Sequence, residues 1–235
     1  MTLNELHKYI QEFHRVEDLG NAWSEIFNTK EASPENIREK KGPHGRLFKL
    51  AGEELGPLIE WMEIYHQDRE GRVIDGNQSF DAEVRRPDTG AVIRLEIGFA
   101  TDGYQEALRA EQLSRDGRAG AFHDLKRVQR DKSADVGINK KKDTKSRSEI
   151  VEELLENLKR LAEKKAEKEK YEPPLALLLF LDNRLPLSSR GLDGLKAGAE
   201  EILRRHDWVF DKVDVLCARH GLIASWTKSG RHSGA

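Results

Sequence analysis

Cysteine is nearly absent from this sequence, and so are the motifs of several common enzyme classes. Cys217 is the single cysteine among 235 residues. It excludes a disulfide framework within the chain and is typical of a reducing compartment. The eight histidines include no pair at zinc-ligand spacing. Neither a P-loop nor a GxGxxG motif occurs, so no nucleotide cofactor is expected.

Long apolar runs are also lacking. The longest, PPLALLLFL at 173–181, is far too short to cross a bilayer. The first nine residues do not contain the apolar run of a signal peptide. We therefore expect a cytoplasmic protein with no membrane partner.

No excess of positive charge marks the chain as a whole. It has 40 Lys and Arg against 42 Asp and Glu, a formal net charge of -2. A polyanion such as DNA must therefore be bound by a local basic patch. The segment 123–147 has nine Lys or Arg against four Asp and is predicted to be loop-like. Its candidates for contact with DNA phosphates are Lys140, Lys141, Lys142, Lys145 and Arg147. A surface that serves only solubility is the alternative.

Apolar spacing divides the chain into an N-terminal extension, residues 1–45, and an α/β domain, residues 46–235. Residues 4–19 carry an apolar stripe at intervals of three to four, which predicts one amphipathic helix and a possible homodimer contact. Residues 52–67 predict a second helix by the same pattern. Its acids Glu60 and Glu63 lie largely away from the apolar side.

The stretch FDAEVRRPDTGAVIRLEIGFATDG, residues 80–103, predicts a β-hairpin that leads into a helix. Apolar and polar residues alternate on both sides of Pro87-Asp88-Thr89-Gly90, which has turn composition. A four-residue loop makes paired positions sum to 177, so that Asp81 faces Glu96 and Glu83 faces Arg94. In the following helix, Asp102 and Gln105 have capping-box spacing.

The second half of the chain predicts further helices and strands. A long helix begins near 146 or 148, with an apolar stripe facing the core and a solvated charged end at 159–170. LALLLFL reads as a strand buried on both faces. A helix at 189–206 and the strands VDVLCA and LIASW follow. The predicted fold class is α/β, with a mixed central sheet flanked by helices.

Two facing carboxylates on one sheet face repel each other unless something compensates their charge. A divalent cation would do so, and Mg²⁺ binds one or two carboxylates together with water and phosphate oxygens. The pair Asp81 and Glu96 therefore predicts a site for Mg²⁺ or Mn²⁺ that hydrolyses phosphodiesters. The alternative is the solvated face of an ordinary sheet, with Glu83 and Arg94 as a cross-strand ion pair.

The order of a helix, a hairpin with Asp81 and Glu96, a helix and an apolar strand resembles the core of the PD-(D/E)xK nuclease superfamily, the restriction-endonuclease-like fold. The resemblance covers residues 52–182. It implies a metal-dependent endonuclease acting on DNA, with Asp81 and Glu96 as the metal ligands. In that superfamily an acid from the first helix is sometimes a further metal ligand, and the resemblance implies Glu60 or Glu63 for that position.

The sequence departs from that family at the lysine expected two residues after the second acid, where it has Gly98. No proline precedes Asp81. The candidates for the vacant catalytic position are Arg94, Glu83, Gln105 and Arg109. A nuclease-like fold that only binds nucleic acid or protein is the alternative, and an unrelated α/β protein is a third interpretation.

Overall fold

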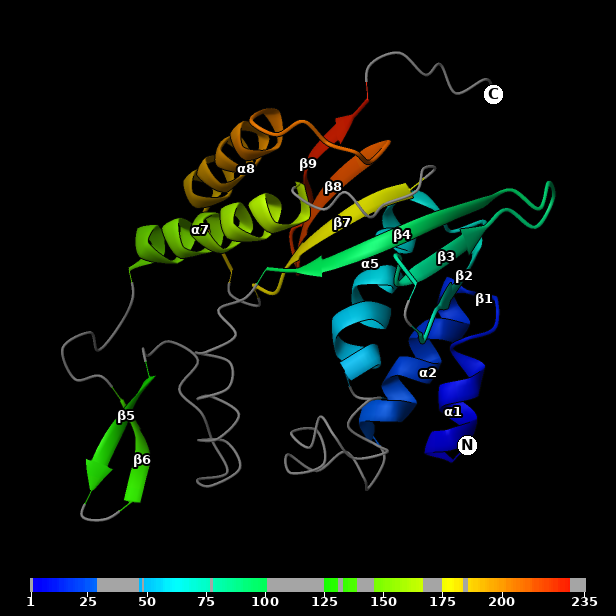
Figure 1. Cartoon of the computed structure of the whole chain (residues 1–235), viewed down its shortest axis with the longest axis horizontal. Coiled ribbons are helices and arrows are strands. Elements are labelled where there is room, and N and C mark those ends of the chain that lie inside the picture. The colour runs from blue at the N-terminus through cyan, green and yellow to red at the C-terminus, as the bar shows by residue number, and fades with distance from the viewer. Residues whose placement is uncertain are drawn as a thin grey trace.

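The computed structural model describes residues 2–28, 47, 49–76, 78–100, 125–130, 133–138, 146–166, 175–183 and 186–228. Within them, one mixed sheet has the strand order β1-β2-β3-β4-β7-β8-β9 (Figure 1). Its strands are β1 (His14–Arg15), β2 (Glu70–Val73), β3 (Ala82–Arg85), β4 (Val92–Phe99), β7 (Leu175–Leu181), β8 (Lys212–Cys217) and β9 (Gly221–Thr227). The α/β class with a mixed sheet and flanking helices is thus confirmed.

Strand direction changes at β4. The strands β1 to β4 pair antiparallel, whereas β4, β7 and β8 run parallel and β9 returns antiparallel. Every residue of β7 is buried, as predicted for an apolar strand in a central position. The sheet therefore places β4, with Glu96, between an antiparallel half and a parallel half.

The predicted hairpin register is confirmed. Ala82 pairs with Leu95 and Glu83 pairs with Arg94 between β3 and β4, so paired positions sum to 177. The turn closes through the amide of Arg86, which donates to the carbonyl of Ala91 at 2.9 Å. Gly90 has φ 70, a conformation that favours glycine. Turn composition and alternation were sufficient here because both act within a short segment.

Helices cover both faces of the sheet (Figure 1). One face packs against α1 (Leu3–Tyr9), α2 (Val16–Asn28), the π-helical turn η1 (Ala51–Leu55) and α5 (Gly56–Tyr65). The other face packs against α7 (Arg147–Ala166) and α8 (Ser189–Arg204). Alternate residues of the parallel strands supply the two cores: Leu178 and Phe180 face the first, and Leu177 and Leu179 face the second. No helix among the described residues has both the length and the apolarity needed to cross a membrane.

The predicted boundary at residue 45 does not separate two cores. Leu6, Ile10 and Leu19 are fully buried in the same core as strand residues such as Val73 and Leu95. The apolar stripe that suggested a homodimer contact is therefore used within the chain. The single helix predicted over 4–19 is wrong, because the chain leaves the helix after Tyr9 and residues 14–15 pair with β2.

Short or highly charged strands were missed by the sequence analysis. β2 has only four residues and includes Gly71, where an added Cβ would lie 2.4 Å from Met62 Sδ of α5. The segment predicted to be loop-like contains β5 (Leu125–Arg130) and β6 (Ser133–Ile138), which pair as a separate antiparallel hairpin. Such runs are too short or too charged to display a clear period of two.

A buried polar network links α5 to the C-terminal strands. The indole of Trp61 donates to Asp214 Oδ2 at 2.8 Å, and the hydroxyl of Ser225 donates to Oδ1 at 2.7 Å. The ammonium of Lys212 lies 2.8 Å from Oδ2. Asp214 is only 2 % exposed, so three polar groups depend on one buried carboxylate.

We expect Asp214→Ala to lower the free energy of unfolding by about 3–5 kcal/mol, because it leaves a buried indole N–H and an ammonium without their acceptor. Urea unfolding followed by tryptophan fluorescence would measure the change. Asp193→Ala on the exposed side of α8 is the matched control and should cost less than about 0.5 kcal/mol. Equal stabilities of the two variants would contradict the structural role of Asp214.

Candidate functional site: an acid cluster beside a buried lysine

Asp81 stands just before β3 and bridges two strands. Its amide donates to Leu95 O at 2.9 Å, and its carbonyl accepts from the Ile74 amide at 2.8 Å. The Ile97 amide donates to Asp81 Oδ2 at 2.8 Å. Burial and the neighbouring Glu96 raise the pKa of this carboxyl, and the Ile97 hydrogen bond lowers it in part. The two acids predicted to lie together therefore interact electrostatically.

Glu54 of η1 is a third acid beside Asp81. Burial, reinforced by the charge of Asp81, raises the pKa of Glu54 to about 8. Its Oε2 atom is buried and has no hydrogen-bond partner in the described part of the chain. An unsatisfied buried carboxyl oxygen is costly, so it indicates a position where a proton or a ligand is expected.

Glu96 points to the opposite face of β4 from Leu95 and Ile97 and meets α7. Its Oε1 forms an ion pair with the ammonium of Lys165, and both side chains are about 90 % buried, with exposures of 9 % and 10 %. The prediction that residues 159–170 form a solvated helix end is wrong at Lys165. The reason is tertiary: a buried carboxylate requires a compensating charge, and α7 supplies it.

Gly98 makes room for this lysine. A Cβ at residue 98 would lie 3.1 Å from Leu161 Cδ2 and 3.3 Å from Lys165 Cε. The stem of Lys165 therefore runs through the space beside residue 98, two positions after Glu96. The ammonium beside Glu96 therefore comes from Lys165 of α7, and residue 98 of β4 is a glycine.

The remaining residues predicted for the site are placed elsewhere. Glu83 accepts from Arg72 Nη2 at 2.7 Å and lies 3.7 Å from Arg94 Nε, in a ladder across three strands. The cross-strand ion pair with Arg94 is thus confirmed. Arg94 also stacks over the Phe80 ring, 5.2 Å from its centroid. Both side chains are engaged in the sheet and do not join the acid cluster.

The helix acids named from the sequence are not the ones beside Asp81. Glu63 is exposed, and Glu60 lines a separate pocket described below. Gln105, Arg109, Lys140, Lys141, Lys142 and Lys145 lie outside the described residues, and Arg147 is the exposed first residue of α7.

The donor set of this cluster suits a hard cation. The described residues contain no group of three or more His, Cys, Asp or Glu side chains arranged around one metal position. Glu54, whose Oε2 has no hydrogen-bond partner in the described residues, and Asp81 nevertheless offer carboxyl oxygens, the ligand type that a hard cation binds. One or two carboxylates are what Mg²⁺ uses when water and phosphate complete its shell. The residues present therefore fit such an ion.

The chain was compared with models of protein families, with curated proteins and with solved structures, and none of the three comparisons finds a match.

Two residues of the cluster, Glu54 and Lys165, were missed by the sequence analysis. Glu54 precedes Leu55 in the segment that was predicted as an amphipathic helix. What distinguishes it from the other acids of that helix is its buried Oε2 without a hydrogen-bond partner in the described residues, which no sequence pattern shows. Lys165 occurs among several lysines of one helix. Lys165 follows Ala162 by three residues and Leu161 by four, which places it on the core-facing side of α7, and this spacing is the signal that would have found it.

The raised pKa of Glu54 makes stability depend on pH. Between about pH 4.5 and 8 the unfolded chain releases this proton and the folded chain retains it, so stability falls as pH rises through this range. Glu54→Gln should make that fall shallower and increase stability at pH 8 by at least about 1 kcal/mol. Urea unfolding at pH 5 and 8 in EDTA would measure both effects.

Glu63→Gln, an exposed glutamate of the neighbouring helix, is the matched control and should leave the pH dependence unchanged. If Glu54→Gln unfolds with the same pH dependence as the native chain, the buried state of this carboxyl is contradicted.

Proposed function

We propose that this protein is a metal-dependent endonuclease of the restriction-endonuclease-like fold that hydrolyses DNA phosphodiester bonds. The observation that carries the proposal is the ion pair of Lys165 with Glu96, with the lysine stem in the space beside Gly98. An acid pair with a lysine next to it is what the resemblance implies for the site, and this ion pair supports the proposal for that reason. The strand order, with β4 between an antiparallel and a parallel partner, supports the same proposal.

Each residue of the cluster has a distinct role in this proposal. Asp81 and Glu96 are the ligands of Mg²⁺ or Mn²⁺, and Glu54 is a further acid available to the same ion. When bound, such an ion activates water and stabilises the charge that develops on the phosphate. The ammonium of Lys165 holds a positive charge next to Glu96, where a phosphate oxygen gains negative charge during hydrolysis.

DNA binding in this proposal relies on the basic segment that ends at α7. Arg147 begins the same helix that carries Lys165 near its other end. Contacts of Lys140, Lys141, Lys142, Lys145 and Arg147 with phosphates would supply affinity without reading sequence. We also propose a cytoplasmic location, which suits Cys217 as a buried free thiol.

A non-catalytic module of the same fold is the second candidate, and one observation favours it. The ion pair of Lys165 with Glu96 already satisfies the buried carboxylate, as a purely structural link would. Such a protein would bind nucleic acid or a protein partner and would not cleave. The two candidates differ in whether the acids are needed for cleavage.

The test is cleavage of supercoiled plasmid in Mg²⁺ or Mn²⁺. We expect the native chain to cut, and Asp81→Asn, Glu96→Gln and Lys165→Ala each to lower the rate by at least about 100-fold, because each removes a ligand or a charge at the reacting phosphate. DNA binding in EDTA should remain. Asp88→Asn, whose side chain is 63 % exposed in the hairpin turn, is the matched control and should cut normally.

Absence of cleavage with either ion by a folded chain that still binds DNA would favour the non-catalytic module. Cleavage that survives Asp81→Asn would exclude Asp81 as a metal ligand.

Moving the lysine from α7 to β4 tests whether cleavage requires the ammonium itself or only the packing of the Lys165 side chain in the core. Lys165→Ala opens the space beside residue 98, and Gly98→Lys returns an ammonium two residues after Glu96. We expect the double variant to cleave at least about tenfold faster than Lys165→Ala. Gly98→Lys alone should be destabilised, since its Cβ meets Leu161 and Lys165. A folded double variant with no recovered cleavage would argue against an active ammonium.

A further inference from the structure

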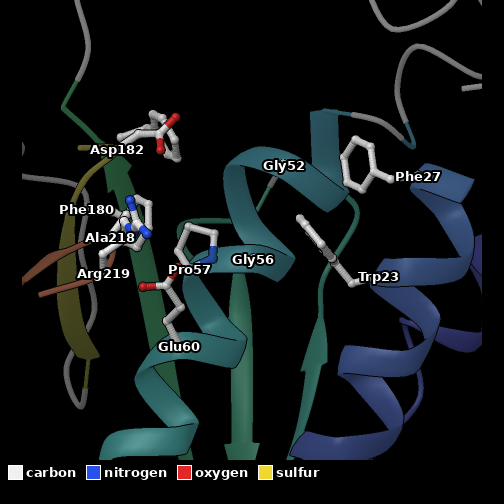
Figure 2. Close-up of a pocket in the computed structure, with 11 residues that line it drawn as sticks. Trp23, Phe27, Gly52, Gly56, Pro57, Glu60, Phe180, Asp182, Ala218 and Arg219 are labelled. Atoms are coloured by element: carbon white, nitrogen blue, oxygen red, sulfur yellow. The ribbon is translucent and has the colours of Figure 1, made fainter. Parts of the chain in front are cut away.

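A second feature adjoins the acid cluster: a pocket of about 690 Å³. It lies where β4, β7 and β8 end, because its lining includes Phe99, the last residue of β4, and Asp182 and Ala218, each just past its strand. Crevices at the carboxyl ends of strands are the usual ligand positions of open α/β sheets. Figure 2 shows Trp23 and Phe27 on one side of η1, and Phe180 and Asp182 on the other.

The walls of the pocket are aromatic. Trp23 and Phe27 of α2 have ring centroids 4.9 Å apart, and Phe99 and Phe180 of the sheet have centroids 5.3 Å apart. The Trp23 indole donates to Ala51 O at 3.0 Å, which fixes its plane. Fixed aromatic rings in a pocket of this volume are suited to stacking with a flat heterocycle.

Two glycines form part of the pocket where η1 passes into α5. Gly52 and Gly56 line the pocket one helical turn apart. An added Cβ at Gly52 would have only Phe27 Cζ near it, at 4.0 Å. The pocket therefore depends on two glycines, and a larger side chain at position 52 would enter it without striking the backbone.

The polar groups at the rim select the kind of ligand. Glu60 and Asp182 place carboxylates at the rim, whose oxygens accept hydrogen bonds from ring N–H and amino groups, and Arg219 places a guanidinium beside them. Arg219, also at the rim, has φ 68, and it alone among the described non-glycine residues has a positive φ. Arg219 lies in the turn that joins β8 to β9, where the His220 amide donates to the Cys217 carbonyl at 2.9 Å.

The pocket is close to the acid cluster along two elements. Phe99 is three residues beyond Glu96 on β4, about 10 Å in an extended strand. Gly52 and Gly56 stand on either side of Glu54, two residues away in each direction.

We infer that this pocket binds an unpaired nucleobase, of the kind that carries an amino group, from the DNA strand whose phosphate lies at the acid cluster. The inference rests on the proposed nuclease function and deepens it, since it makes single-stranded or locally unpaired DNA the substrate class. The base stacks on the aromatic walls and donates to the rim carboxylates. Adenine, cytosine and guanine meet this requirement better than thymine, which has no amino group.

The test is binding of fluorescein-labelled pentanucleotides to the full chain in EDTA, measured by anisotropy. We expect dA5 and dC5 to bind more tightly than dT5. Gly52→Leu, which fills the pocket, should weaken dA5 and dC5 binding by about 5- to 150-fold, the effect of losing one stacked base. Asp182→Asn should retain binding but narrow the difference between dA5 and dT5.

Gly194→Leu is the matched control, because Gly194 lies in α8 with nothing within 4 Å of an added Cβ. It should bind all three pentanucleotides like the native chain. Thermal unfolding establishes that both leucine variants are folded. Gly52→Leu binding equal to the native chain, or equal affinities for dA5 and dT5, would overturn the inference.

Two further arms separate this inference from the proposed function. Unlabelled dAMP should displace labelled dA5 at least tenfold more weakly than unlabelled dA5 does. Equal displacement would mean that the pocket binds a free nucleotide and not a base of a DNA strand, which would overturn the inference. Selective binding by a chain that never cleaves plasmid would support the pocket and refute the nuclease. Cleavage of plasmid and single strands that Gly52→Leu leaves unchanged would support the nuclease and refute the pocket.

Discussion

The buried carboxylate of Glu96 is the constraint on which this arrangement depends. It lies on the α7 face of the central strand β4, surrounded by an apolar core, and a buried charge there requires a partner. Lys165 satisfies it from α7, and Gly98 leaves the space that the lysine stem occupies. One ion pair thus fixes where the last turns of α7 lie on the sheet.

The same constraint explains why the acid cluster is asymmetric. Glu96 has its compensating cation, whereas Asp81 relies mainly on a backbone amide and Glu54 has a buried oxygen without a partner in the described chain. Within the described residues, Lys165 thus neutralises Glu96 directly, whereas burial acts on Asp81 and Glu54 by raising the pKa of each carboxyl.

The π-helical turn η1 joins the acid cluster to the aromatic pocket. Glu54 interacts electrostatically with Asp81, while Gly52 and Gly56 line the pocket. π-helical turns often occur at functional sites, because the extra residue changes which side chains face each side of the helix. The five residues of η1 thus contribute to both the acid cluster and the aromatic pocket.

Local sequence patterns were sufficient for those parts of the fold that depend on neighbouring residues. Alternation and turn composition predicted the hairpin and its register, and apolar content predicted β7, because these patterns are local. Three features followed only from the folded chain. Glu54 is the helix acid beside Asp81, residues 14–15 form a strand, and Lys165 is buried. Those outcomes depend on contacts between residues far apart in the chain, such as Glu96 and Lys165. Patterns within a short segment do not report the energies of such contacts.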